Sequence, residues 1–296
     1  MKKFILFYNP LSGKADFKNK IDSFIKEMHQ YGALIIPIRT SQREDAALIE
    51  QLILQIEITG ILIAGGDGTL RETVNFLCQK GIDLPIGIIP AGTSNDLANF
   101  LGLNNDLAAC AAIFNAGKTR PLDVGRVNGQ YFLNTASIGT AANVAHSTNT
   151  ALKNTLGKIA YYLKVALLLP QLQPIPLKIN LDSLVVEDEV FLFVAGNSKT
   201  VGGFAAVLPY ALLDDGKLDT LIIKKCPLWE LILLLPALLK GDHIHSKYVT
   251  YLQASRITAE GSPLIESDLD GELGPFLPLT IEVVPKKILV YAPDKV

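Results

Sequence analysis

Hydrophobic positions in the first hundred residues alternate between two periods. Four short apolar runs predict buried β-strands: residues 4–8, 33–38, 61–64 and 86–89. Apolar residues three and four positions apart predict three helices between them: residues 17–28, 46–53 and 69–79. Strands that alternate with helices across short loops indicate an α/β domain, with a parallel sheet covered on both faces.

The pattern changes after about residue 120. Short strand-like segments separated by turn residues, such as Asn128-Gly129, predict an antiparallel β-rich second domain, interrupted by a helical stretch at about 154–169. We therefore divide the chain into an α/β domain, residues 1–122, and a β-rich domain, residues 123–287. The apolar run near the end predicts that residues 288–296 return to the first domain.

Composition excludes several classes of protein. With 49% hydrophobic and 19% charged residues, we expect a sizeable core and no extended disorder. The net charge of -2 gives no electrostatic case for binding nucleic acid, which needs a basic face. Cys78, Cys110 and Cys226 are widely spaced, which excludes a disulfide framework and fits a reducing cytosol.

Two apolar stretches bear on membrane contact, at residues 159–170 and 228–239. Both are too short to span a bilayer, and the second contains a glutamate and a proline. We favour helices packed in the fold and keep open that one of them touches a membrane surface.

Three polar loops follow predicted strands: NPLSGK at residues 9–14, GGDGT at 65–69 and PAGTSNDLA at 90–98. The carboxyl ends of strands are where ligands collect in parallel sheets, so we expect the loops to share one site. NPLSGK lacks the glycine spacing and Lys-Ser/Thr pair of a Walker A loop.

Asp67 is the unusual residue of the second loop. Glycines beside it permit close approach to a ligand, and Thr69 is predicted to cap the following helix, whose amides favour an anion. A carboxylate repels phosphate, so Asp67 is expected to hold a divalent cation that bridges to the phosphates. The alternative is that Asp67 caps a tight turn.

These loops, with DGE at residues 270–272, resemble the diacylglycerol kinase catalytic family, especially its soluble bacterial lipid kinases of the YegS-like and BmrU-like type. The likeness covers essentially the whole chain in order, because Thr40 after the second strand, Asp123-Val124-Gly125, LGKIAYYL at 156–163 and LLDDGKLD at 212–219 also fit. It implies a Rossmann-like, NAD kinase-like α/β domain followed by an antiparallel β-sandwich-like domain.

The resemblance also implies roles for individual residues. Asp67 and Asp123 match the acidic pair that organises the catalytic Mg²⁺, and Glu272 matches the general base. Asp215 matches the side-chain ligand of a second, structural metal, with the carbonyls of Leu212 and Lys217. The positions expected around ATP are Asn9, Lys14, Thr40, Gly65, Gly66, Asp67, Gly68, Thr69, Leu70, Arg71, Glu72, Thr93 and Asn95.

Some of these roles have an alternative interpretation, and at two positions the chain departs from the family pattern. Without the resemblance, Glu272 would be interpreted as a solvent-exposed turn residue, and Asp215-Gly216 as a hairpin turn. Asn99 stands where the family often has an arginine facing phosphate, for which Lys14 or Lys158 could substitute. Phe204 stands where the family often has a third glycine, which leaves the lipid acceptor open. We interpret His243 and His245 as surface residues.

The sequence therefore predicts a two-domain, ATP- and Mg²⁺-dependent kinase that phosphorylates a lipid hydroxyl, with diacylglycerol or a related lipid as acceptor. We expect it to be cytoplasmic, with transient peripheral membrane contact, and leave a homodimer open. One alternative is an NAD kinase, although no Thr-Gly-Ser-Thr-like acceptor segment is present. The other is a nucleotide- or lipid-binding regulator without catalysis.

Overall fold

The computed structural model describes residues 1–13, 17–40, 50–53, 55–92, 95–139, 169–182, 184–201 and 206–293. The chain forms two compact units. Unit 1 comprises Met1–Leu122 and Lys286–Val296, and unit 2 comprises Asp123–Pro285. The predicted boundaries lay at residues 122/123 and 287/288. Most of the predicted helices at 46–53 and 154–169 lie outside the described residues.

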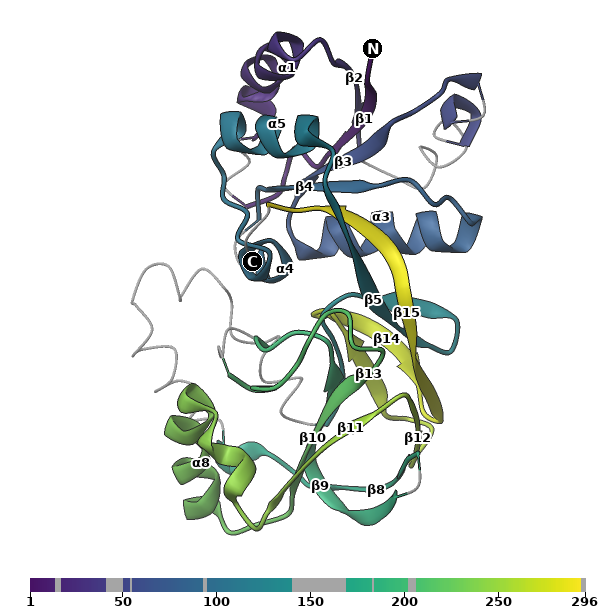
Figure 1. The fold of residues 1–296 in the computed structure, drawn as a ribbon. Helices are drawn as coiled ribbons and strands as arrows, with labels where there is room; N and C mark the ends of the chain where they lie inside the picture. The colour runs from purple at the N-terminus through teal and green to yellow at the C-terminus, as the bar shows by residue number, and fades with distance from the viewer. Residues whose placement is uncertain are drawn as a thin grey trace. The chain divides into compact units, whose positions relative to one another are not determined.

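Unit 1 is built on a parallel sheet with the strand order β15-β4-β3-β1-β2 (Figure 1). Its strands are β1 (Lys3–Tyr8), β2 (Leu34–Arg39), β3 (Gly60–Gly65), β4 (Ile86–Pro90) and the end of β15 (Leu279–Tyr291). Its helical elements are η1 (Phe17–Asn19), α1 (Ile21–Gln30), α3 (Asp67–Lys80), α4 (Asp96–Phe100) and α5 (Leu107–Ala116). The parallel α/β prediction is confirmed, whereas α5 was not predicted.

Side-chain alternation along the strands explains why helices cover both faces of this sheet. Phe4 and Leu6 of β1 share a core with Phe24 of α1 and Phe114 of α5. Figure 1 shows α1 and α5 on one side of the sheet and α3 on the other. All strands of the sheet end at one edge, which places the loops after β1, β3 and β4 next to one another.

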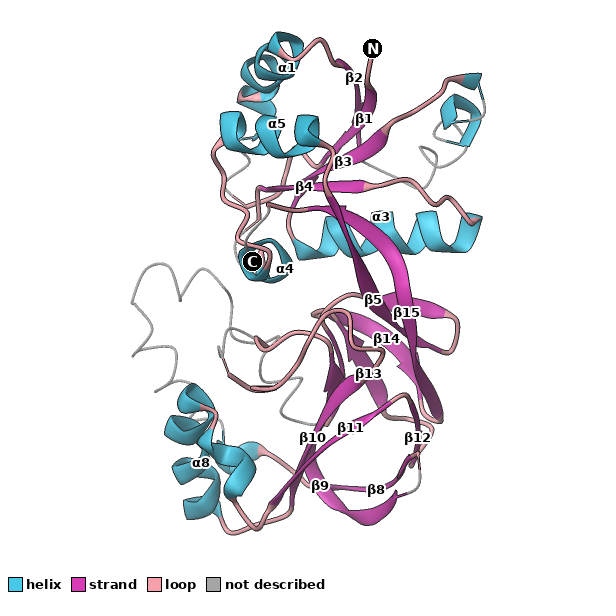
Figure 2. Cartoon of the chain, in the orientation of Figure 1, coloured by secondary structure: helices cyan, strands magenta, loops and turns pink. Residues whose placement is uncertain are grey.

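Unit 2 is an antiparallel β-sandwich-like unit, as predicted, and strands dominate it (Figure 2). β5 (Thr119–Val127) enters it from unit 1. Its other strands are β6 (Gln130–Phe132), β7 (Thr135–Ile138), β8 (Ile175–Leu181), β9 (Leu184–Gly196), β10 (Leu218–Lys224), β11 (Val249–Ala254), β12 (Arg256–Glu260), β13 (Glu266–Leu269), β14 (Glu272–Phe276) and the start of β15. Its described helical elements are η2 (Leu169–Gln171), α8 (Leu228–Lys240) and η3 (Asp242–His245). Asn128 and Gly129 form the predicted turn, with positive φ angles of 46° and 90°.

Two features of unit 2 bear on the sequence predictions. His243 is only 1% exposed, so its interpretation as a surface residue is wrong; His245 is exposed. The apolar stretch at residues 228–239 forms α8, as expected. Among the residues described, no helix has the length and hydrophobicity needed to cross a bilayer.

Candidate active site

Backbone contacts bring the three polar loops of unit 1 together. A Cβ added to Gly92 would lie 2.3 Å from the Cα of Gly66, so the loop after β4 touches the loop after β3. A Cβ on Gly13 would lie 2.4 Å from the carbonyl oxygen of Ala91, which brings in the loop after β1. Glycine at these positions allows an approach that any side chain would block.

Side-chain hydrogen bonds reinforce this convergence. The Nδ2 of Asn9 donates to Thr69 Oγ1 at 3.2 Å, and the Ser12 hydroxyl lies 3.4 Å from the same oxygen. Thr40, at the end of β2, donates its amide and its hydroxyl to the carbonyl of Tyr8. The polar ends of four strands are therefore connected at one edge of the unit 1 sheet.

Asp67 occupies the start of α3. Gly66 is the N-cap, so the prediction that the helix begins at Thr69 and is capped by it is wrong. Thr69 is the third residue of α3 and is buried. Its side chain packs so close to Gly65 that a Cβ on Gly65 would lie 2.6 Å from the Thr69 Cβ. The tight strand-to-helix connection explains the early start, because Gly66 is extended and the chain turns directly into the helix.

The Asp67 carboxylate reaches across to the loop after β4. Its Oδ1 accepts the amide of Asp96 at 3.0 Å. Burial raises the pKa of the Asp67 carboxyl above its usual range, while hydrogen bonds from the amides of residues 95–97 oppose that shift. Turn capping and a cation role therefore do not exclude each other: one oxygen orders the neighbouring loop, and the carboxylate remains the acidic group of this edge.

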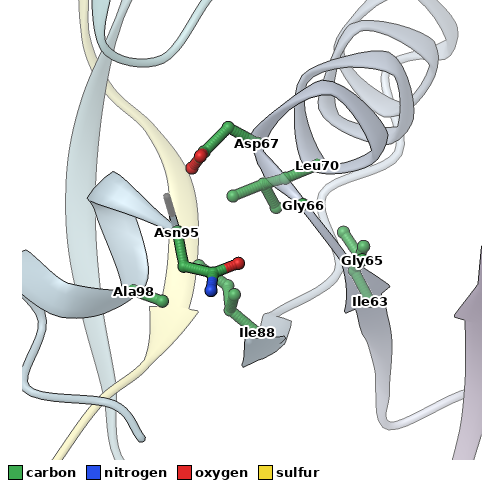
Figure 3. A pocket seen from close by; sticks show the side chains of 8 residues that line it. All are labelled: Ile63, Gly65, Gly66, Asp67, Leu70, Ile88, Asn95 and Ala98. Carbon is green, nitrogen blue, oxygen red and sulfur yellow. The ribbon is translucent and has the colours of Figure 1, made fainter. Parts of the chain in front are cut away.

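A recess lies beside Asp67 (Figure 3). Gly65, Gly66, Asp67 and Leu70 line one side, and Asn95 and Ala98 line the facing side, above Ile63 and Ile88. Its cavity volume of about 10 Å³ is close to the roughly 10–15 Å³ that a single water molecule needs, so the recess is a shallow notch at the base of the loops.

Asn95 and Arg71 take different parts in this site. The side-chain Oδ1 of Asn95 accepts the backbone amide of Gly92 at 2.8 Å, and its Nδ2 donates to the Gly92 carbonyl at 3.0 Å. The Asn95 side chain therefore closes the loop. Arg71 lies one turn after Asp67 on α3, and its Nε is buried without a hydrogen-bond partner in the part of the chain that the structure describes. An unpaired buried guanidinium donor fits an anionic ligand. Glu72 is exposed on the same helix, and Gly68 lies within its first turn.

Asp123, on β5 in unit 2, is held against the 212–217 loop. It is 2% exposed; its Oδ2 accepts the Gly216 amide at 2.6 Å, and its own amide donates to the Leu213 carbonyl at 2.7 Å. The Asn197 side chain donates to the Asp123 carbonyl at 3.2 Å. Asn197 was not predicted, because it lies 74 residues from Asp123 in sequence.

The expected structural-metal residues lie in that loop. Described residues 206–217 contain no strand, so Asp215-Gly216 is not the hairpin turn of the alternative reading. The Asp215 carboxylate is exposed, and it accepts from the Lys217 amide at 3.1 Å and from Gln253 at 3.4 Å. One carboxylate with the carbonyls of Leu212 and Lys217 fits an oxygen-ligated cation completed by water. No cluster of three acidic, histidine or cysteine side chains occurs among the described residues.

Glu272 is the first residue of β14 and is exposed. The described part of the chain provides no hydrogen-bond partner for its side chain. Lys14, Thr93, Lys158 and Phe204 lie outside the described residues.

Comparison with known proteins agrees with this organisation. Residues 3–127 match the diacylglycerol kinase catalytic domain, and residues 134–292 match the YegS C-terminal NAD kinase beta sandwich-like domain. The chain is 36% identical to a diacylglycerol kinase of Bacillus subtilis (strain 168) over 280 residues, which cover 94% of this chain and 92% of that protein. It is 32% identical to a diacylglycerol kinase of Staphylococcus carnosus (strain TM300) over 295 residues, covering 100% and 96%.

A solved structure extends the comparison. A diacylglycerol kinase from Bacillus anthracis str. Sterne superposes with a TM-score of 0.80 at 28% identity, over 99% of this chain and 98% of that one. Sequence and fold thus agree along nearly the full length. The chain belongs to the diacylglycerol kinase family of lipid kinases.

Proposed function

We propose that this kinase transfers the γ-phosphate of ATP to a lipid hydroxyl, with diacylglycerol or a closely related lipid as acceptor. The observation that carries the proposal is the convergence of the loops after β1, β3 and β4 around Gly66 and Gly92. Close-packed glycines, the N-terminus of α3 without a side-chain cap, and the Nε of Arg71, which has no hydrogen-bond partner among the described residues, form the kind of surface that receives a phosphate chain. The relatives named diacylglycerol kinase support the choice of acceptor.

Three carboxylates divide the chemistry in this proposal. Mg²⁺, when bound, would neutralise charge on the phosphates, with Asp67 and Asp123 as its acidic partners, partly through water. Glu272 accepts the proton of the lipid hydroxyl as its oxygen bonds to the γ-phosphorus. The bond between that phosphorus and the bridging oxygen breaks, and ADP leaves. Glu272 suits this role because its side chain is exposed and has no hydrogen-bond partner among the described residues.

Membrane contact forms part of the proposal, because the acceptor resides in a bilayer. On α8, Leu231 and Leu234 are buried, while the outer face exposes Trp229 (59%) and Leu233 (61%). Ile232 and Leu228 extend this apolar face, and Lys240 ends the helix. A tryptophan among aliphatic residues, followed by a terminal lysine, suits a helix lying at a lipid surface. We name this set the α8 face and propose that it docks transiently on the bilayer.

The test measures transfer of label from γ-labelled ATP to a panel of lipids in vesicles, including diacylglycerol, phosphatidylglycerol and a sphingoid base. Glu272→Gln should lower turnover by about 100-fold or more, because a positioned general base contributes roughly 10²–10⁴-fold. ATP binding and the melting temperature should stay unchanged. Glu266→Gln, another exposed glutamate on the same hairpin, is the control and should keep its turnover.

The outcomes separate the alternatives. Unchanged turnover by Glu272→Gln would remove Glu272 from the mechanism. Label transferred to NAD instead of lipid would favour an NAD kinase. ATP binding without transfer to any lipid of the panel would favour the silent regulator.

A further inference from the structure

The DGE segment forms a tight turn in unit 2. Asp270 and Gly271 connect β13 to β14 as a two-residue loop, with Leu269 paired to Glu272. Both loop residues have positive φ angles, 54° for Asp270 and 90° for Gly271, as a type I′ hairpin requires. Glu272 therefore follows directly from a turn whose geometry Asp270 and Gly271 determine.

Asp270 does more than occupy the turn. Its Oδ2 accepts the Leu133 amide at 2.7 Å, and its Oδ1 accepts the amides of Asn134 and Thr135, both at 2.8 Å. The Asp270 amide donates to the Thr135 carbonyl at 2.9 Å. One carboxylate thus accepts three consecutive amides at the entry to β7, the last of them from the first residue of the strand, and these charge-assisted bonds fix the turn against that segment.

The segment that Asp270 holds is connected to Asp123. The Asn134 carbonyl accepts the Asn197 amide at 2.9 Å, and the Asn197 side chain donates to the Asp123 carbonyl. Asn197 is fully buried, so this connection is shielded from water. Asp270 and Asp123 are therefore anchored to one hydrogen-bonded frame within unit 2.

We infer that Asp270 is a positioning residue: its grip on residues 133–135 sets the place and direction of the Glu272 carboxylate. This inference rests on the proposed role of Glu272 as base. Asparagine tolerates positive φ as well as aspartate does, but its NH₂ group would face the Leu133 amide. Asp270→Asn therefore keeps the turn preference and removes one of the three amide bonds.

Asp182 offers a matched control in the same unit. It also has a positive φ, 48°, and its carboxylate accepts the amides of Ser255 and Arg256 at 3.0 and 3.1 Å. It lies in the β8–β9 connection, outside the DGE hairpin. Asp182→Asn should therefore destabilise the unit in a similar way without affecting Glu272.

The experiment compares Asp270→Asn, Asp182→Asn, Glu272→Gln and the double variant Asp270→Asn/Glu272→Gln in the lipid kinase assay. Asp270→Asn should lower kcat by about 10- to 100-fold and leave KM for ATP within about twofold, because a small misplacement of a catalytic group has effects of this size. Asp182→Asn should keep kcat. The double variant should be no slower than Glu272→Gln, since Asp270 acts through Glu272.

Two results would overturn the inference while leaving the proposed function intact. One is a normal kcat for Asp270→Asn. The other is a double variant whose fold-loss in kcat equals the product of the two single-variant losses. A normal kcat for Glu272→Gln itself would instead refute the proposed base. If Asp270→Asn lacks a cooperative unfolding transition, Asp270→Ser, which keeps one acceptor oxygen, takes its place under the same criteria.

Discussion

The Asp67 carboxylate at the start of α3 accepts the backbone amide of Asp96 at 3.0 Å, and so joins the GGDGT helix to the loop after β4. The contact spans 29 residues of sequence and ties the first turn of one helix to the start of another. It gives Asp67 a structural role beside the role proposed for it in the chemistry, and substitution can separate the two.

Asp67→Asn should lose activity without losing stability. Burial raises the Asp67 pKa, so the folded state disfavours its ionised form. The protonated carboxyl is the form that the folded state favours, so its contribution to stability is fully present below pH 3.8 and is lost as pH rises through the raised pKa of the folded state. Asparagine has no such group to ionise, so the variant keeps its stability over this range. At neutral pH the variant should therefore unfold at equal or higher denaturant concentration, whereas its turnover should fall by about 100-fold or more.

Chemical denaturation at acid and neutral pH, alongside the lipid kinase assay, checks both parts. A variant clearly less stable than the wild type at neutral pH would show that the Asp96 contact requires the charge.

Gly92→Ala should impair both folding and nucleotide binding. The new methyl would lie 2.3 Å from Gly66 Cα, and neither backbone can move without opening the loops. We expect a loss of about 1–3 kcal/mol in unfolding free energy, as for overpacked sites, together with weaker ATP binding by calorimetry.

Gly32→Ala is its control. Gly32 has a φ of 69° and open space around it, so alanine there should cost about 1–2 kcal/mol through backbone strain alone. ATP affinity equal to wild type in Gly92→Ala would count against a ligand site at the Gly66–Gly92 contact.

His243 should make unit 2 sensitive to mild acid. His243 is buried, and its Nε2 lies 3.0 Å from the Val207 carbonyl oxygen. Burial lowers its pKa below 6.5; of the nearby charged groups, Asp242 raises the pKa and His245 lowers it. A neutral buried histidine contributes stability above pH 6.5, which is lost as pH falls toward the lowered folded pKa, because the unfolded state takes up the proton first.

Denaturant melts at about pH 7.5 and about pH 5.5 should show a smaller acid loss for His243→Gln than for wild type. His245→Gln, at the exposed neighbour, should behave as wild type. An identical pH dependence for wild type and His243→Gln would contradict the assignment.

The α8 face should determine vesicle binding. Trp229→Ser with Leu233→Ser removes the two most exposed apolar side chains of α8, each worth about 1–2 kcal/mol if half buried in lipid. Co-sedimentation should weaken by at least about tenfold, while turnover of a dispersed short-chain acceptor stays unchanged. Leu264→Ser, at a residue 86% exposed in a turn, is the control and should bind vesicles normally. Equal binding by the double variant and the wild type would refute docking through this face.

The sequence predicted the parallel sheet well, because buried strands such as Ile61–Ala64 are continuous apolar runs. It also predicted that polar loops would gather at one edge, since the carboxyl ends of parallel strands must lie together. The start of α3 was misplaced because the two glycines before Asp67 conceal how abruptly the strand ends. α5 escaped prediction, as its alanine-rich sequence has little helical periodicity.

Long-range hydrogen bonds were beyond the reach of sequence patterns. Asp270 meets residues more than 130 positions earlier, and Asn197 meets Asp123 across 74. Buried His243 forms its hydrogen bond with the carbonyl of Val207, 36 residues earlier, a contact that local hydrophobicity does not reveal. Such contacts follow from strand order, and strand order in an antiparallel unit is not readable from spacing.

The most direct test of the proposed function is the fate of the γ-phosphate. Purified protein is incubated with γ-labelled ATP, Mg²⁺ and vesicles containing diacylglycerol, and the lipids are extracted and separated. We predict label in a phosphorylated lipid, at a rate that Glu272→Gln reduces by about 100-fold or more. ATP binding to the folded protein with no label in any lipid would contradict the account.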